Sequence, residues 1–226
     1  MCGRFVGFRR LAQLKQYLPI DVANVTVSPN YNIAPTQRIL AIARYDGSNH
    51  LDQYFWGLVP PWAQDPSVGI RMINARSETA ASKPSFRAAF KKRRCLIPAD
   101  GFYEWTGTKG DRQPMLLTLP DNSPMAFAGL WEVWDDKGQA KAPYRSCTIM
   151  TRQASPSVQP VHDRMPVILK PEAYAFWLDP GNEDVEALMG ILQRLIHTDL
   201  VSVPVSRRVN AVQNNTPENM VPDPNR

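Results

Sequence analysis

A cysteine occupies the second position of this chain, in the opening Met1-Cys2-Gly3-Arg4. Removal of Met1 would leave Cys2 with a free α-amine and a thiol on adjacent carbons, and such a 1,2-aminothiol can capture an aldehyde first as an imine and then as a thiazolidine. An α-amine has a pKa of about 7.7 to 8.0, against roughly 10.4 for lysine, so a useful fraction is neutral and nucleophilic near pH 7. The alternative is that Cys2 is merely a small second residue that suits initiator processing.

A second cluster places an amide and a guanidinium two residues apart, in Ile73-Asn74-Ala75-Arg76-Ser77-Glu78-Thr79. In an extended chain Asn74 and Arg76 share a face, which suits recognition of sugar oxygens and of a phosphate. The structural alternative is a strand end that leads into a helix capped by Ser77 or Thr79. That alternative accounts for the hydroxyl groups but not for Asn74 and Arg76.

Two further clusters carry groups that can move protons. In Ala99-Asp100-Gly101-Phe102-Tyr103-Glu104-Trp105, strand alternation predicts that Phe102 and Glu104 point one way and Tyr103 and Trp105 the other. Partial desolvation among aromatic neighbours would raise the pKa of Glu104 and make it a usable proton donor or acceptor. His162 lies in the loop Val161-His162-Asp163-Arg164-Met165-Pro166 and has an ordinary pKa of about 6.5. A rim glutamate and a surface histidine are the structural alternatives.

Composition is that of a globular protein with a basic balance. The 226 residues favour one domain or at most two, and 43% hydrophobic residues exclude wholesale disorder. A net charge of +5 is compatible with a polyanionic partner, although any one basic run can also be a solvated face. The basic residues gather in three places: Arg4, Arg9 and Arg10; Arg87 and Lys91 to Arg94; and Arg207 with Arg208.

The three cysteines cannot all pair with one another, and no spacing resembles a zinc site. We therefore expect no metal and no cofactor, and we expect Cys95 and Cys147 to be buried thiols. No stretch resembles a membrane span or an apolar leader, so no membrane partner is expected. A reducing setting, in the cytoplasm or at the nucleoid, fits best.

The chain carries 21 prolines, about 9% of its residues against a typical usage of about 5%, which favours short strands joined by shaped loops. Neighbouring strand patterns joined by short turns predict an α+β fold that is strand-rich, with a mainly antiparallel barrel- or sandwich-like core and a few peripheral helices. A hairpin is expected around Asp46-Gly47-Ser48-Asn49. The expected strands are 38–44, 51–58, 94–97, 101–105, 114–119, 125–131, 144–151, 166–169 and 200–205.

Helical spacing predicts a helix over residues 9–18 that ends at Pro19, and a later helix that Asn182 caps. Shorter helices are expected from Pro171 to Leu178 and from near Pro84. The segment Asn30 to Pro35 is predicted to be a rigid loop. Residues 1–213 are expected to form a single domain, and residues 214–226, rich in Asn and Pro, a flexible tail.

Six motifs, in order along nearly the whole chain, closely resemble the SRAP family, the SOS-response-associated peptidase domain of abasic-site shield proteins. They are Met1-Cys2-Gly3-Arg4-Phe5, Tyr31-Asn32-Ile33-Ala34-Pro35, Phe55-Trp56-Gly57-Leu58-Val59-Pro60, Asn74-Ala75-Arg76-Ser77-Glu78-Thr79, Ala99-Asp100-Gly101-Phe102-Tyr103-Glu104-Trp105 and His162-Asp163-Arg164-Met165-Pro166. The stretch from Pro204 to Asn210 also resembles the family's C-terminal phosphate-binding segment. Some relatives carry consecutive tryptophans after the Pro-rich turn, whereas Trp62 is followed here by Ala63.

The resemblance implies that Cys2, exposed after loss of Met1, crosslinks to the ring-opened sugar of an abasic site in single-stranded DNA. It places Asn74, Glu104 and His162 at the remaining active-site positions. DNA contacts are expected from Arg4, Pro35, Trp62, Arg76, Trp105, Arg164, Arg207 and Arg208. Family members are also thought to remove their own initiator, and a monomer is expected here.

Two other classes of function remain open at this point. A cysteine hydrolase could pair Cys2 with His162 and cleave its own first peptide bond or an external substrate. A non-catalytic single-strand binding module would need only the arginines and tryptophans, and it would bind undamaged and abasic DNA equally well.

Overall fold

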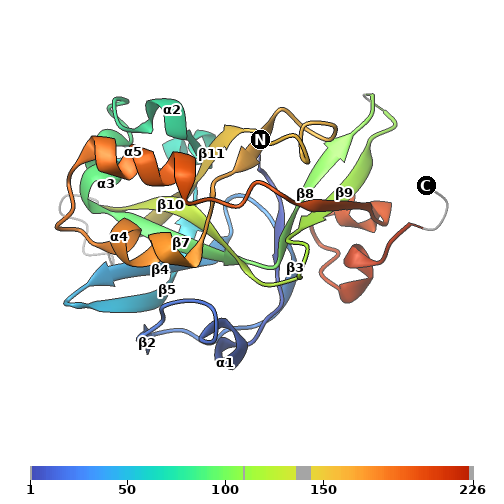
Figure 1. Cartoon of the computed structure of the whole chain (residues 1–226), viewed down its shortest axis with the longest axis horizontal. Helices are drawn as coiled ribbons and strands as arrows, with labels where there is room; N and C mark the ends of the chain where they lie inside the picture. Colours follow the sequence, from blue (N-terminus) through green and yellow to red (C-terminus); the bar gives the residue numbers. More distant parts are fainter. Residues whose placement is uncertain (1, 109, 136–143, 224–226) are drawn as a thin grey trace.

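Five strands close into a barrel in the computed structural model, which describes residues 2–108, 110–135 and 144–223 (Figure 1). Around the barrel each strand pairs with the next and the last with the first; β5 and β11 are parallel, and the other pairs are antiparallel. The strands, in their order around the barrel, are β4 (Arg38–Tyr45), β5 (Ser48–Trp56), β11 (Tyr144–Gln153), β10 (Met125–Trp134) and β7 (Arg94–Ala99).

Four short strands extend the barrel sheet at its edges: β2 (Val22–Ala23), β6 (Asn74–Arg76), β12 (Arg164–Pro166) and β13 (Ile168–Leu169). Both β6 and β12 pair with β11, β6 in parallel and β12 antiparallel. Two segments that are far apart in the sequence therefore both lie next to the end of β11.

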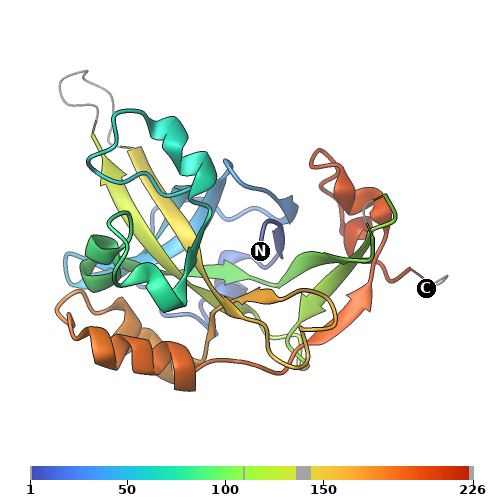
Figure 2. The same cartoon turned by 90° about the horizontal axis from the view of Figure 1, so that it is seen from above.

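A second, five-stranded antiparallel sheet stands beside the barrel, as Figure 2 shows from above. Its order is β14 (Val201–Pro204), β9 (Gln113–Thr118), β8 (Gly101–Thr106), β1 (Phe5–Gly7) and β3 (Asn30–Ile33). The predicted strand-rich α+β fold with a barrel-like core is confirmed. The parallel pairings of β11 and of β2 with β5 were not expected, because they join segments that no short turn connects.

Alternate residues of the barrel strands face different cores. Ala41 and Ala43 of β4 belong to an inner cluster with Phe127 and Cys147, whereas Ile42 packs outward with residues of the helices. The inner space is tight at Gly129 of β10, because an added Cβ would lie 2.8 Å from the Cys95 sulfur. Cys95 and Cys147 are buried, free thiols, as predicted.

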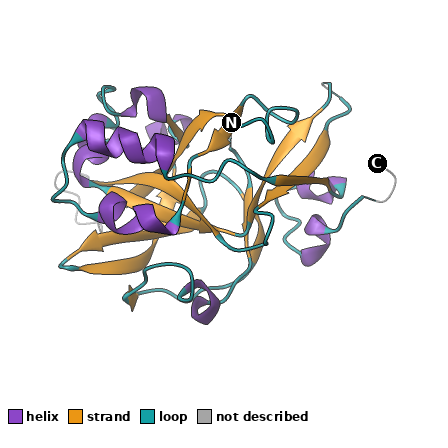
Figure 3. Ribbon diagram, viewed as in Figure 1, coloured by secondary structure: helices purple, strands orange, loops and turns teal. Residues whose placement is uncertain are grey.

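The helices lie outside the strands, and most of them gather on one side of the barrel (Figure 3). The α-helices are α1 (Leu11–Leu14), α2 (Ser77–Ala80), α3 (Arg87–Lys92), α4 (Tyr174–Leu178) and α5 (Val185–Arg194), and the 3-10 helices are η1 (Pro66–Arg71), η2 (Pro171–Ala173), η3 (Arg207–Asn210) and η4 (Pro217–Met220). Asn219 in η4 is buried, and its amide donates to the Asn214 carbonyl at 2.6 Å.

Three local predictions need correction. The helix expected over residues 9–18 is regular only from Leu11 to Leu14, since so short a segment before Pro19 gains few hydrogen bonds for the cost of nucleation. The cap of α5 is Asp184, not Asn182, because the Asp184 carboxylate accepts from the amides of the next turn. Asn30 to Ile33 form strand β3 instead of a loop, because β1 offers them an edge to pair with.

The predicted hairpin joins β4 and β5 through a two-residue turn. Asp46 and Gly47 both have positive φ, at 51° and 78°, and this conformation suits an Asp-Gly pair between two twisted strands. The local sequence alone fixes this connection.

An aromatic cluster joins the small sheet to the barrel. The Phe5 ring of β1 contacts Trp56 of β5 and Phe127 of β10 edge to face, with centroids 5.2 and 5.8 Å apart. Phe102 of β8 also packs on Phe127, at 6.1 Å. The start of β1 is thereby held against the barrel interior.

Within the part of the chain that the structure describes, no helix is long and apolar enough to cross a membrane.

Candidate functional site

Cys2 lies at the junction of the barrel and the small sheet. Its side chain is fully buried and belongs to the inner cluster, together with Phe5 and Trp56. Burial raises the pKa of the Cys2 thiol well above its usual range, and the nearby Glu104 carboxylate raises it further. The thiol is therefore protonated at neutral pH, and it needs a base close by in order to act as a nucleophile.

Strand β6 brings Asn74 to Cys2. The parallel register of β6 on β11 fixes this segment, with Asn74 opposite Ile149, and the Trp56 indole donates to the Ile73 carbonyl at 2.8 Å. The Asn74 side-chain amide donates to the Cys2 carbonyl at 2.8 Å. Its carbonyl oxygen, Oδ1, is buried and has no hydrogen-bond partner among the described residues. One strong acceptor therefore stays open beside Cys2.

Glu104 comes from β8, and its charge acts on the Cys2 thiol. The strand alternates as predicted, since Phe102 faces the barrel cluster while Tyr103 and Trp105 belong to the opposite cluster. Only 5% of Glu104 is exposed, and burial raises the pKa of its carboxyl from 4.5 to about 7. A group with this pKa is half protonated near neutral pH, so it can both accept and donate a proton.

His162 is held in one orientation by the backbone that follows it. The Arg164 amide donates to His162 Nδ1 at 2.9 Å, and the Arg164 carbonyl lies 3.2 Å from the same nitrogen, so the backbone at Arg164 fixes the direction of Nδ1. Burial lowers the pKa of His162, although the Asp163 carboxylate, 2.9 Å from Nδ1, opposes this effect. The neutral ring is thus favoured near pH 7.

Arg4 and Asn32 form the centre of a hydrogen-bond network next to Cys2. Arg4 Nη1 donates to Asn32 Oδ1 at 2.6 Å and to the Val209 carbonyl at 2.7 Å. The fully buried Asn32 amide donates in turn to three carbonyls of the C-terminal segment, those of Val209, Ala211 and Asn214. The Arg4 guanidinium stands over the Trp105 ring, 5.7 Å from its centroid. Residues 209–214 are thereby tied to β3, which carries Asn32, and to Arg4 just before β1.

The Arg164 guanidinium, expected to hold a phosphate, is engaged within the protein. Its Nη1 and Nη2 donate to the two oxygens of Glu78 at 2.7 and 3.0 Å, and Nη2 also donates to the Thr151 carbonyl at 2.8 Å. Only 15% of the Arg164 side chain is exposed. In this conformation Arg164 is anchored to two neighbouring elements.

The other expected DNA contacts lie in different settings. Arg76, Arg207 and Arg208 are exposed, and Arg207 forms an ion pair with Asp111 in the turn between β8 and β9. The Trp105 indole donates to Asn210 Oδ1 at 2.7 Å, so this ring is fixed to η3.

The remaining two expected contacts lie in turns. Trp62 is 60% exposed in the turn after Pro60, whereas Pro35 is half-buried between β3 and β4. Trp62 therefore offers an open aromatic face.

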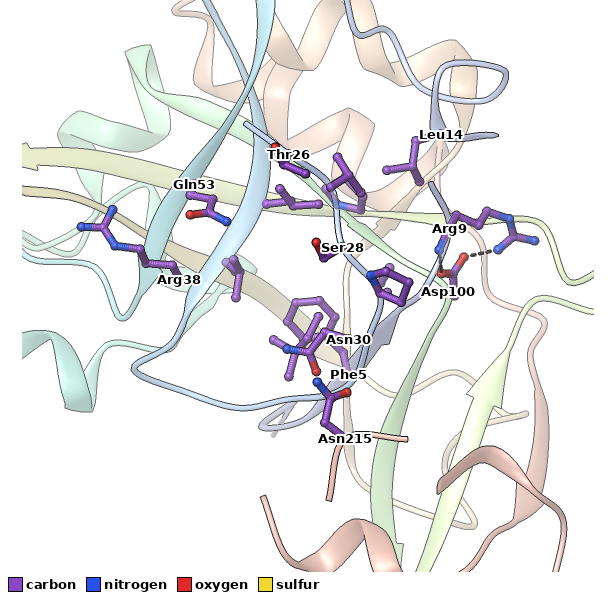
Figure 4. Close-up of a pocket in the computed structure, with 18 residues that line it drawn as sticks. Phe5, Arg9, Leu14, Thr26, Ser28, Asn30, Arg38, Gln53, Asp100 and Asn215 are labelled. Carbon is purple, nitrogen blue, oxygen red and sulfur yellow. Dashed lines mark hydrogen bonds and ion pairs between the residues drawn. The ribbon is translucent and has the colours of Figure 1, made fainter. Parts of the chain in front are cut away.

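A separate cavity of about 330 Å³ lies between the segment 26–30, β1 and the barrel strand β4 (Figure 4). Its 18 lining residues include Phe5 and Arg38, but none of Cys2, Asn74, Glu104 and His162. Asp100 at one end accepts from the amides of Phe8 and Arg9 and pairs with the Arg9 guanidinium.

Sequence reasoning missed the supporting residues Asn32 and Glu78. Both lie inside motifs on which the family resemblance rests, Tyr31 to Pro35 and Asn74 to Thr79, and that position was the available signal. Arg112 was also missed. Its charge lowers the pKa of His162, but nothing in its local sequence indicates this proximity. Among residues 2–108, 110–135 and 144–223, no group of three His, Cys, Asp or Glu side chains could hold a metal ion.

The fold, the buried Cys2 and Glu104 and the half-buried Asn74 define a barrel protein with a cysteine three residues before its first strand. A crystal structure of a protein from Bacteroides thetaiotaomicron has the same fold, with a TM-score of 0.79 at 21% identity over 95% of this chain and 100% of that one. The family model of SOS response associated peptidase (SRAP) matches residues 1–212. The chain belongs to the SRAP family.

Two named relatives match this chain over nearly the whole length of both proteins. The abasic site processing protein YoqW of Bacillus subtilis is 41% identical over 222 residues, which is 96% of this chain and 98% of that protein. The abasic site processing protein YedK of Escherichia coli is 30% identical over 228 residues, which is 98% of this chain and 100% of that protein.

Proposed function

We propose that this protein processes abasic sites in single-stranded DNA and shields them by a covalent thiazolidine crosslink to Cys2. Membership of the SRAP family and the names of its relatives support DNA with abasic sites as the substrate. The observation that carries the chemistry is that the Asn74 amide and a buried Glu104 carboxyl, whose pKa is about 7, both lie close to the buried Cys2.

The reaction begins with the open, aldehyde form of the abasic deoxyribose. After cleavage of the Met1–Cys2 bond, the free Cys2 amine adds to the aldehyde carbon and gives a carbinolamine. The protonated Glu104 carboxyl donates to the hydroxyl group of this intermediate, which leaves as water, so that an iminium ion and a Glu104 carboxylate remain. The Cys2 sulfur then bonds to the same carbon while the thiol proton passes to the Glu104 carboxylate. Because both nucleophiles are on one residue, the second step is intramolecular, where effective molarities can reach about 10⁵ M or more.

Each of the other two residues has a defined task in this scheme. His162 moves the protons when the sugar opens: its neutral ring takes the proton of the anomeric hydroxyl, and the imidazolium ion returns one to the ring oxygen of the closed hemiacetal. The open acceptor on Asn74 Oδ1 holds the Cys2 amine or the sugar hydroxyl. Prompt capture of the imine by sulfur keeps the same intermediate from leading to strand scission.

Binding of the DNA strand is assigned to exposed cations and an aromatic face. Arg76, Arg207 and Arg208 follow the backbone, and Trp62 takes the place of the paired tryptophans of some relatives. A stacked base contributes roughly 1 to 3 kcal/mol without reading sequence. Non-covalent affinity is therefore expected to fall steeply with salt.

A cysteine hydrolase has less support. A hydrolytic cysteine works as a thiolate, whereas burial and Glu104 both raise the pKa of Cys2. Cleavage of an external peptide library in the absence of abasic DNA would favour that function instead.

Intact mass measurement tests the proposal directly. Mixing the purified protein with an abasic oligonucleotide should give an adduct whose mass equals the two components less Met1 and one water. Cys2→Ser should lose this durable adduct while keeping salt-sensitive DNA binding, and an adduct of unchanged yield would refute the role of the thiol. An undamaged oligonucleotide is the control for binding without chemistry. Met1 retained in Cys2→Ser but absent from the wild type would indicate self-processing.

The role of Glu104 has its own test. Glu104→Gln keeps the shape of the side chain and removes its proton transfer, so adduct formation should slow by about 10²-fold or more. Binding of the abasic oligonucleotide should change far less. Equal losses of rate and of affinity would contradict a role in proton transfer.

A further inference from the structure

The motif from Asn74 to Thr79 contains a carboxylate, that of Glu78, which contacts Arg164 on another element of the site. Glu78 stands in α2, four residues after Asn74, and its two oxygens accept from both terminal nitrogens of Arg164 at 2.7 and 3.0 Å. Such a two-point contact fixes the orientation of both side chains, unlike a single contact between flexible charges. Nothing in the proposed reaction uses Glu78 itself.

The partner of Glu78, Arg164, contacts His162 through its backbone. The Arg164 amide donates to His162 Nδ1 at 2.9 Å, so the position of the imidazole depends on the backbone at Arg164. The Arg164 side chain is anchored at Glu78 and at the Thr151 carbonyl, which its Nη2 reaches at 2.8 Å. The chain of contacts from Glu78 to His162 is therefore continuous.

This contact spans two strands that are not paired with each other. Strand β6, which carries Asn74, lies along one edge of β11, and β12, which begins at Arg164, lies along another. Thr151 of β11 is opposite Arg76 of β6 and opposite Pro166 of β12. The ion pair between Glu78 and Arg164 therefore links the β6–α2 segment directly to β12, next to Thr151.

We propose that Glu78 is a positioning residue, which acts through Arg164 to hold His162 in a fixed orientation and at a fixed distance from Asn74. The carboxylate does not touch the substrate. Its two hydrogen bonds hold the Arg164 side chain in place, and with it the backbone amide that donates to His162 Nδ1. The kinetic consequence rests on the proposed function, whereas the geometric consequence does not.

The geometric part is tested by ¹⁵N NMR of the imidazole of His162 in the DNA-free protein. The wild type should show a single tautomer, because the imidazole is held in one environment, and Glu78→Ala should give a mixture of tautomers in exchange. Glu78→Gln can keep one of the two hydrogen bonds, so its tautomer populations should lie between those of the wild type and of Glu78→Ala. An unchanged tautomer in Glu78→Ala would overturn the proposal.

The kinetic part uses single-turnover crosslinking to an abasic oligonucleotide. The maximal rate should fall between about 2-fold and 30-fold in Glu78→Ala, with the half-saturating DNA concentration unchanged. A weaker half-saturation at an unchanged maximal rate would show that Glu78 acts on DNA binding, and this result too would overturn the proposal. If the wild type forms no crosslink while the tautomer still shifts, the proposed function fails and the positioning role stands.

A matched control comes from the ion pair of Glu183 with Lys92, at 3.0 Å. The Glu183 side chain is 46% exposed and that of Glu78 48%, so Glu183→Gln removes a comparable surface carboxylate. It should leave the His162 tautomer and the rate unchanged. Equal effects of Glu183→Gln and Glu78→Gln would contradict a specific role for Glu78. Because Glu78→Gln removes no packing volume, it remains a test even where Glu78→Ala does not fold.

Discussion

Replacement of the buried Glu104 by glutamine should change how the stability of the protein depends on pH. Burial raises the pKa of this carboxyl from 4.5 to about 7, which corresponds to roughly 3 kcal/mol of unfavourable free energy for ionising it in the folded state. Since Glu104 is only 5% exposed, little of this penalty is relieved by solvent. Glutamine does not ionise and carries no such penalty.

The direction follows from proton binding in the two states. Between pH 4.5 and 7 the folded protein holds a proton on Glu104 that the unfolded chain has released, so the stability of the wild type falls as the pH rises through this window. The stability of Glu104→Gln relative to the wild type should therefore increase by roughly 2 to 3 kcal/mol between pH 5 and pH 8. For a chain of this size that is about 4 to 12 °C in melting temperature.

Urea unfolding of both proteins at several pH values measures this difference. Only its change with pH is interpreted, so any constant effect of the substitution on packing cancels. The two samples must have the same amino terminus, which intact mass establishes. Glu183→Gln, at the surface, serves as the control for the loss of a carboxylate. A difference between Glu104→Gln and wild type that is the same at pH 5 and pH 8 would refute the reasoning.

Three other predictions concern the framework and the DNA surface. Asn32→Ala removes the buried amide that binds three C-terminal carbonyls, so unfolding free energy should drop by roughly 3 kcal/mol. Limited proteolysis should then cut first within residues 207–214, and unaltered protection there would contradict this role. Gly129→Ala places a Cβ 2.8 Å from the Cys95 sulfur, and overpacking should destabilise the barrel by about 1 to 3 kcal/mol in urea unfolding; a neutral result would mean that the inner cluster adapts. Arg207→Ala should reduce the slope of log affinity for single-stranded DNA against log salt by about 0.7, and an unchanged slope would place Arg207 away from the strand.

The local connections and the strands were predictable because their signals are short-range. The Asp46-Gly47 turn, the alternation along β8 and the buried Cys95 and Cys147 follow from residue type and neighbouring positions alone. The parallel contacts of β11 were not predictable, because they pair segments separated by many residues and no local pattern encodes such a pairing. The cap at Asp184 also escaped, since Asn182 suits the same role equally well by sequence.

By itself, the sequence determined which groups are present: a cysteine that can become an aminothiol, a glutamate between aromatic residues, and a histidine in a loop before a strand. Only the tertiary structure decided the pKa values of these groups and which residues they contact. The Glu104 carboxyl has a pKa near 7 because the barrel and the small sheet together exclude water from it, and Asn74 reaches Cys2 because β6 pairs with a strand more than 70 residues further along the chain. Burial and long-range pairing depend on the whole folded chain, and for that physical reason no local segment could reveal them.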